Sequence, residues 1–184
     1  KIIEEIEKIN RKNFMYKNKS FAYEDSAMPI GHGQTISQPS TVARMISLLN
    51  LKKTDYVLEI GTGSAWNAAL MGYLSKKVTT IEIVKELTEK AIEKIKKQNI
   101  KNIEVQQKDF RKLNQKFNKV IFTAGIKPSQ ERIIENFAKT HLKEKGILVC
   151  PYQYGQLMIL NYKKGKIKKD YTEEEYQFVP LILN

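Results

Sequence analysis

After Asn50 the chain alternates between short apolar segments and longer amphipathic segments, and this alternation restricts the fold more than any other feature. The apolar segments have the length of buried parallel strands, and the amphipathic segments have the spacing of helices. The pattern predicts strands at 55–61, 78–84, 103–110, 118–125 and 146–152, and helices at 67–77, 85–99 and 128–142. A repeated strand–helix order predicts a mostly parallel sheet with helices on both faces.

The last part of the chain departs from this order. Two strand-like runs within 155–182 are joined through Lys163–Lys164–Gly165–Lys166, with no helix between them. A short connection that contains glycine predicts a β-hairpin, and therefore an antiparallel edge to the sheet. At 184 residues the chain fits one domain, 1–184, in which 1–50 is a helical and looped extension and 51–184 is the sheet.

The composition indicates the cellular compartment and argues against a membrane span, a disulfide and a metal site. No apolar run approaches the roughly 18 to 20 residues that span a bilayer, and the first twelve residues are amphipathic with mixed charge, unlike a signal peptide. A single cysteine, Cys150, excludes an intrachain disulfide, and with only His32 and His141 beside it no metal site is expected. These features favour a cytoplasmic protein that has no contact with a membrane.

The net charge of +12 raises the question of nucleic-acid binding. Only four of the 32 basic residues are arginine, and the lysines are distributed along the chain and interleaved with glutamate, as in 85–98. Such interleaving is typical of a solvated helix face with i,i+4 pairs. We therefore expect no dedicated nucleic-acid site, although charge alone does not decide function.

The segment EIGTGSAW, 59–66, follows the first predicted strand of the sheet. Gly61 and Gly63 allow a tight turn there and let a ligand approach the backbone N–H groups that begin the next helix. Trp66 stands where the dinucleotide-binding fingerprint would place its third glycine, and no Gly-Lys-Ser/Thr sequence follows, so a phosphate-binding loop is not favoured.

Three carboxylates stand at the ends of consecutive predicted strands: Glu59, Glu82 and Asp109. Glu59 would repel a phosphate but attract an ammonium or sulfonium group. Glu82 comes 19 residues after Gly63, close to the spacing at which an acidic residue binds ribose hydroxyls. An adenosine ligand with a cationic, phosphate-free tail fits this set, and S-adenosyl-L-methionine is such a ligand.

Four segments resemble the protein-L-isoaspartate O-methyltransferase family: PIGHGQTISQPSTVARM, VLEIGTGS, TIEI and QFVPLI. The first segment is the most diagnostic, because the glycine loop is common to many methyltransferases. The resemblance implies a Rossmann-like class I methyltransferase fold, in which a seven-stranded sheet has its last pair antiparallel. It also implies protein repair, in which the α-carboxylate of L-isoaspartyl residues is methylated by S-adenosyl-L-methionine and S-adenosyl-L-homocysteine is released. The expected partners are damaged proteins and peptides, and the expected state is a monomer.

The resemblance also implies roles for particular residues. Ser37 of the TISQP motif falls at the methyl-transfer site. Its neighbours Ile36 and Gln38, together with Val179 and Pro180 near the C-terminus, fall on the substrate side. The expected cofactor-binding residues are Glu59, Gly61, Thr62, Gly63, Ser64, Glu82, Ile83, Asp109 and Phe110.

Alternatives remain at this stage. Ser37 could cap the helix that begins near Pro39 rather than orient a substrate. The lysine excess is compatible with a methyltransferase of the same fold that acts on RNA. Ala65, Ser40 and the segment after Asp109 depart from the family pattern, which leaves room for a weakly active or non-catalytic binding homologue.

Overall fold

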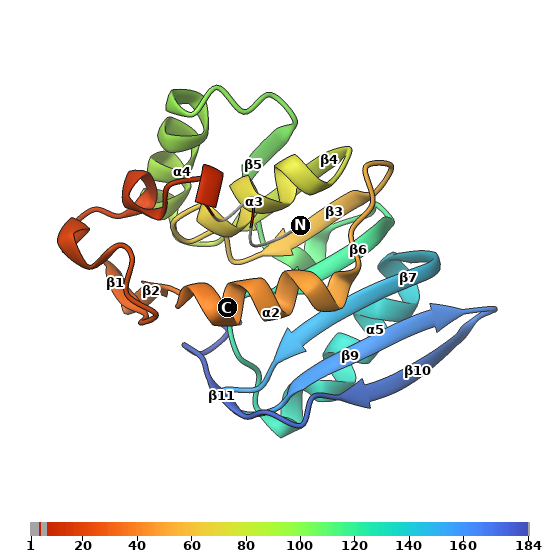
Figure 1. The fold of residues 1–184 in the computed structure, drawn as a ribbon. Helices are drawn as coiled ribbons and strands as arrows, with labels where there is room; N and C mark the ends of the chain where they lie inside the picture. The colour runs from red at the N-terminus through yellow and green to blue at the C-terminus, as the bar shows by residue number, and fades with distance from the viewer. Residues whose placement is uncertain (1–3, 5–6, 184) are drawn as a thin grey trace.

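The computed structural model describes residue 4 and residues 7–183 and contains a seven-stranded sheet in the order β10-β9-β7-β6-β3-β4-β5 (Figure 1). Strands β7, β6, β3, β4 and β5 are parallel, whereas β9 and β10 form an antiparallel hairpin beside β7. The strands are β3 (Tyr56–Ile60), β4 (Lys77–Glu82), β5 (Ile103–Gln107), β6 (Phe117–Phe122), β7 (Leu142–Pro151), β9 (Leu157–Lys163) and β10 (Lys166–Tyr171). The predicted mostly parallel sheet with a C-terminal hairpin is confirmed.

Helices cover both faces of this sheet. Three lie on one face, α2 (Pro39–Leu49), α3 (Trp66–Leu74) and α4 (Lys85–Lys97), and α5 (Glu131–His141) lies on the other, behind the sheet in Figure 1. Successive strand side chains point to opposite faces, so Val57 joins the core under α2–α4 and Leu58 joins the core under α5. Two apolar layers therefore hold one rigid sheet, whose strand ends carry the site.

Two segments differ from the sequence prediction because local geometry intervenes. Strand β7 begins at Leu142, directly after α5, rather than at Gly146. The third strand of the prediction, 103–110, ends at Gln107, and the 3₁₀ turn η3 (Phe110–Lys112) follows it. The carboxylate of Asp109 accepts the N–H of Arg111 at 2.9 Å and so starts this turn.

The N-terminal extension is more ordered than the expected helix and loop. Besides α2 and the 3₁₀ turns η1 (Arg11–Phe14) and η2 (Lys19–Phe21), it contains a hairpin of β1 (Met28–Gly31) and β2 (Gln34–Ile36). Its turn holds three consecutive residues with positive φ, Gly31 to Gly33. Residues 1–3, 5 and 6 of the expected extension lie outside the described part of the chain.

The C-terminal segment returns across the sheet toward β6. The short strands β8 (Tyr154–Gly155) and β11 (Tyr176–Gln177) pair, and beyond them Gly125 donates to the carbonyl of Val179 at 2.7 Å. Leu181 donates in return to the carbonyl of Gly125 at 2.8 Å. The 3₁₀ turn η4 (Pro128–Gln130) leads from there into α5. Within the described residues, no helix is long and apolar enough to cross a bilayer.

Candidate active site

One pocket lies beyond the carboxyl ends of the parallel strands and encloses about 970 Å³, part of which is open to solvent. Its walls come from the ends of β3, β4, β5 and β6, from the first turn of α3, from the segment that joins β2 to α2, and from the C-terminal segment. Clefts at this edge of an open α/β sheet are the usual ligand sites of such folds.

The pocket gathers thirteen of the fourteen residues expected at the site: Ile36, Ser37, Glu59, Gly61, Thr62, Gly63, Ser64, Glu82, Ile83, Asp109, Phe110, Val179 and Pro180. Gln38 is the exception. It is the residue that precedes α2, and its side-chain amide donates to the hydroxyl of Ser40 at 3.0 Å, outside the pocket. The substrate-binding role expected for Gln38 therefore has no geometric support.

The glycine loop depends on its two glycines for different reasons. Gly61 has φ +97°, and a Cβ atom there would lie 2.4 Å from Oγ1 of Thr123, whose hydroxyl donates to the Gly61 carbonyl. Gly63 has φ +49°, and its N–H donates to Glu82 at 3.0 Å. The first glycine therefore keeps strand β6 close to the loop, and the second connects the loop to the end of β4.

Glu82 is fixed by three backbone N–H groups. One carboxylate oxygen accepts from Gly63, and the other accepts from Ile83 at 2.9 Å and Val84 at 3.1 Å. A carboxylate offers about four acceptor positions, so about one remains on the oxygen that faces Gly63. This is the capacity that a ribose hydroxyl would require.

Asp109 is held differently. Both of its oxygens accept from the guanidinium of Arg111, at distances from 2.5 to 3.0 Å, and one also accepts the Arg111 N–H. These hydrogen bonds lower the pKa of Asp109. The carboxylate borders the pocket, but its acceptor positions are largely occupied, and it organises η3. Its cofactor-binding role stays a prediction.

Glu59 is the most perturbed acid of the site. It is fully buried, and burial raises its pKa to about 8, although hydrogen bonds from Thr80 and Asn67 oppose this shift. The hydroxyl of Thr80 lies 2.5 Å from one carboxyl oxygen, and the amide nitrogen of Asn67 lies 2.8 Å from the other. The hydroxyl of Thr62 extends this chain, 2.7 Å from that of Thr80. Glu59 is therefore held neutral at pH 7 until a cation approaches.

Asn67 was not singled out by the sequence, but the structure gives it a role. Its amide oxygen is buried and has no hydrogen-bond partner among the described residues, although the residue borders the pocket. Buried polar atoms are rarely left unpaired, so an orphan of this kind indicates a missing ligand donor. The sequence could have drawn attention to Asn67, because it is a polar residue in a helix that is otherwise almost entirely apolar, WNAALMGYL.

Ser37 borders the pocket, and its hydroxyl has no hydrogen-bond partner among the described residues. It does not cap α2. Gln38 takes the N-cap position, and the N–H of Ser40 in the first turn is bound instead by the carboxylate of Asp25 at 2.8 Å. The Ser37 hydroxyl is therefore available to a ligand.

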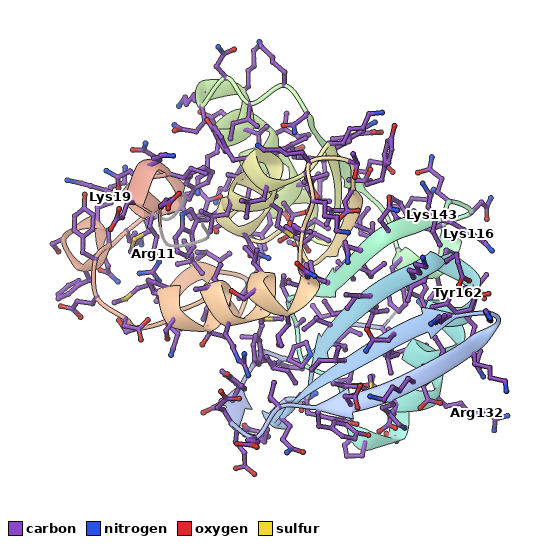
Figure 2. All side chains as sticks on the ribbon, turned by 45° about the vertical axis from the view of Figure 1, so that its right-hand side comes forward. Arg11, Lys19, Lys116, Arg132, Lys143 and Tyr162 are labelled. Carbon is purple, nitrogen blue, oxygen red and sulfur yellow. The ribbon has the colours of Figure 1, made fainter. Side chains whose placement is uncertain are left out.

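Arg11 holds the backbone behind Ser37. Its guanidinium lies between the N-terminal turns and the first turn of α2 (Figure 2) and donates to the Ser37 carbonyl at 3.1 Å. It also reaches the carbonyls of Ala22, Glu24, Ser26 and Ile36. Only 3% of Arg11 is exposed, and it lies 5.5 Å from the centre of the Trp66 ring. One buried cation thus joins the N-terminal extension to the wall of the pocket. The sequence gives no local signal for this role of Arg11.

Comparison with known proteins decides the family. The model of the protein-L-isoaspartate(D-aspartate) O-methyltransferase family matches residues 1–184. This chain belongs to that family. A protein-L-isoaspartate O-methyltransferase of Fervidobacterium nodosum is 38% identical over 98% of this chain and 93% of its own length. The protein of the same name from Yersinia enterocolitica is 35% identical over 99% and 88%.

Solved structures agree in fold. One protein-L-isoaspartate O-methyltransferase superposes with a TM-score of 0.85 at 24% identity. The superposition covers 100% of this chain and 61% of the other, longer chain. A putative family member from Plasmodium falciparum, crystallised with S-adenosyl-L-homocysteine, superposes with a TM-score of 0.80 at 24% identity over 100% of this chain and 90% of its own.

The residues of this family member fit S-adenosyl-L-methionine. The unpaired oxygen of Asn67 and the carboxyl of Glu59 are suited to an ammonium group, and the free acceptor position of Glu82 is suited to a ribose hydroxyl. The glycine loop borders the pocket, and Gly61 lets it lie against Thr123, where a Cβ atom would come within 2.4 Å of Oγ1. Among the described lining residues, the carboxyl groups of Glu59, Glu82 and Asp109 outnumber the one lysine, Lys108, so the pocket favours a cationic ligand over a phosphate.

Two of the three departures from the family pattern, Ala65 and Ser40, lie outside the pocket, whereas the segment after Asp109 begins with Phe110, which borders it. Ala65 has φ +68°, but its methyl group is fully buried in the core beneath α2–α4 and does not border the pocket. Ser40 is exposed and receives the amide of Gln38. Neither substitution obstructs the ligand, which weakens the hypothesis of a decayed binding homologue.

Proposed function

We propose that the chain is a protein-repair methyltransferase. It transfers the methyl group of S-adenosyl-L-methionine to the α-carboxylate of L-isoaspartyl residues in damaged proteins and peptides, and it releases S-adenosyl-L-homocysteine. The observation that carries this proposal is the meeting of three family segments at one pocket: the TISQP serine, the glycine loop and the C-terminal Val179–Pro180. Family membership and the names of the relatives support it.

When bound, S-adenosyl-L-methionine supplies an electrophilic methyl group on its sulfonium sulfur. The accepting carboxylate has an ordinary pKa near about 4 and is ionised at neutral pH, so the reaction requires no general base. No histidine borders the described pocket. The work of the chain is therefore alignment and exclusion of water.

Ser37 performs the alignment. Its free hydroxyl donates a hydrogen bond to the incoming carboxylate and orients one oxygen without neutralising it. The apolar side chains of Ile36, Ile60 and Val179 line the same pocket and would limit the access of water. Glu59 and Asn67 hold the ammonium end of the cofactor at the opposite wall, and Glu82 holds its ribose.

Transfer of labelled methyl groups to an isoaspartyl peptide and to its normal aspartyl twin tests the proposal. The expected result is incorporation into the isoaspartyl peptide alone, in an ester that is labile to base. Equal labelling of both peptides, or labelling of neither, would overturn the proposed reaction.

We further propose that the enzyme acts as a monomer in the cytoplasm. Cys150 is a buried free thiol whose pKa is raised by burial, and a free thiol fits a reducing compartment. No nucleic acid and no membrane takes part in the proposed reaction. Light scattering at micromolar concentration would contradict the monomer if the mass were twice that of the chain.

A further inference from the structure

The edge of the sheet opposite the pocket has a distinct composition. The five parallel strands all begin at this edge, and the turn between β9 and β10 lies there too, because β9 runs antiparallel to them (Figure 1). We call the lysines at these strand ends and turns the basic edge. They are Lys52, Lys53, Lys76, Lys77, Lys101, Lys116, Lys143, Lys145, Lys163, Lys164 and Lys166.

The basic edge carries most of the net charge of the chain. Its eleven lysines are accompanied by three acids, the exposed Glu104 and Glu144 and the buried Asp55, which leaves +8 of the total of +12. The remainder of the chain has 21 basic and 17 acidic residues and carries only +4. The sequence indicated dispersed, interleaved lysines, and this holds for α4, where Lys97 pairs with Glu93. The fold brings the other lysines together.

The acids at this edge do little to neutralise it. Glu104 pairs with Lys77 at 2.6 Å, and Glu144 accepts the backbone N–H of Lys164 at 3.0 Å. Asp55 is buried and accepts the N–H of Lys52 at 2.9 Å. Ten of the eleven lysines are exposed, and Lys143 is half-buried. A row of cations therefore faces solvent with few carboxylates beside it.

An aromatic side chain lies within this row. Tyr56, the first residue of β3, is 37% exposed. The Nζ atoms of Lys76 and Lys143 lie 5.1 Å and 4.7 Å from the centre of its ring. The two ammonium groups are thereby held in place rather than left to swing freely. Figure 2 shows Lys116, Lys143 and Tyr162 together at this side of the molecule.

We propose that the basic edge binds the phosphate backbone of a nucleic acid, without reading its base sequence. Neighbouring strands lie about 4.8 Å apart, so seven strands extend the row over about 29 Å. One strand of a duplex carries about eight phosphates over that length, at 3.4 Å each. A lysine row of this kind matches the spacing and charge of such a backbone.

A protein partner fits this surface less well. The cores of protein interfaces are depleted in lysine and enriched in aromatic and apolar anchors, whereas the basic edge consists almost entirely of lysine. The pocket lies at the opposite edge, so a nucleic acid bound here leaves the active site open. Strands β3 to β6, which separate the two edges, have five or six residues each and so span about 17 to 20 Å. This is about twice the Debye length at physiological salt, so the basic edge contributes little to steering of the substrate carboxylate.

Anisotropy titrations with labelled, unrelated 24-nucleotide RNA and 24-base-pair DNA would test the proposal. The test variant replaces Lys101, Lys116, Lys145 and Lys163 with Gln; these side chains have no partner among the described residues. The matched control replaces Lys12, Lys17, Lys85 and Lys112, which are equally exposed and lie elsewhere. Both variants lose the same net charge. Isoaspartyl methylation by the test variant serves as a folding check and stays at the wild-type level.

The wild type is expected to bind both probes with a dissociation constant between about 1 and 100 μM near physiological salt. Affinity should fall steeply with added salt. The test variant should bind at least tenfold more weakly, with a salt slope smaller by about 3, and the control should change less than threefold. Equal losses in both variants would overturn the proposal, as would absence of binding at 50 mM salt. Equally tight binding of polyglutamate or of anionic vesicles would overturn it in favour of another polyanion.

Discussion

Replacement of Glu59 by Gln should stabilise the ligand-free protein while weakening cofactor binding. The amide reproduces the neutral acid. Its oxygen accepts from Asn67 as the carboxyl does. Thr80 donates to the carboxyl in the wild type, and in the variant the amide NH₂ donates to the Thr80 hydroxyl instead, so this hydrogen bond is reversed but kept. Thr80 then donates to Thr62, 2.7 Å away. No buried hydrogen bond is lost, and a group that resists ionisation in the fold is removed.

The size of the effect follows from the pKa. The unfolded carboxyl releases its proton near pH 4.5, whereas burial keeps the folded one protonated up to about pH 8. Between these values the folded state binds the extra proton, so the stability that Glu59 contributes falls as pH rises. At about 1.4 kcal/mol for each pH step, the Gln variant gains up to about 3 kcal/mol at pH 7 and little at pH 5.

Urea unfolding of both proteins at pH 5, 6, 7 and 8 measures this difference directly. Subtracting the two curves removes the contributions of all other titrating groups, because these are shared. Glu104→Gln is the matched control. Its exposed carboxylate pairs with Lys77 and has a lowered pKa, so its loss should cost little and should not increase stability at pH 8.

A pH-independent difference between pH 5 and 8 would refute the reasoning, since it would mean that Glu59 is already ionised in the free protein. Ligand binding supplies an independent check. If the ammonium group of S-adenosyl-L-homocysteine ionises Glu59, binding releases a proton, and the calorimetric enthalpy then depends on the ionisation enthalpy of the buffer. The Gln variant should lose this dependence and bind about tenfold more weakly, which corresponds to about 1.4 kcal/mol.

Three further predictions concern the same pocket. Ser37→Ala should lower kcat/KM about 10- to 100-fold, the value of a hydrogen bond to a charged group, while urea unfolding changes by less than about 0.5 kcal/mol; a large stability loss with normal turnover would instead indicate a structural role. Arg11→Lys provides three donors for five carbonyls and should cost about 2 kcal/mol or more of stability and reduce turnover; unchanged values for both would contradict its positioning role. Gly61→Ala places a Cβ 2.4 Å from the Thr123 hydroxyl and should abolish cofactor binding in calorimetry. Gly33→Ala is the control, because Gly33 also has a positive φ, +69°, but has open space around it. The control should lose only about 1 kcal/mol of stability through backbone strain and should still bind the cofactor.

The strand and helix pattern was predictable because each segment is periodic in itself. Val57 and Leu58 face opposite cores, as strict alternation in a buried strand requires, and the predicted strand bounds lie within a few residues of the observed ones for most strands. The C-terminal hairpin followed from Gly165 in its turn. The glycine loop could be placed because strand ends and glycines are local signals.

The features of the fold and of the site that the sequence did not predict depend on contacts between distant segments. Arg11 reaches the Ser37 carbonyl across 26 residues, and Trp66 donates its indole N–H to the carbonyl of Ile9 across 57. Nothing near either residue in the sequence signals these bonds. The β1–β2 hairpin was missed for the same reason, because its strands are short and partly polar. The orphaned oxygen of Asn67 likewise becomes visible only when α3 is packed beside Glu59.

The topology explains why one chain can hold two surfaces of opposite character. Parallel strands place all their carboxyl ends at one edge, where Glu59, Glu82 and Asp109 converge on the pocket. The same rule places all their amino ends at the other edge, where lysines in the first residues of each strand or in the turn before it add to one another. A lysine near a strand start is harmless to the core, since it lies in solvent. Substitutions at the basic edge should therefore alter binding of polyanions while leaving methyl transfer intact, and substitutions at the pocket should do the reverse.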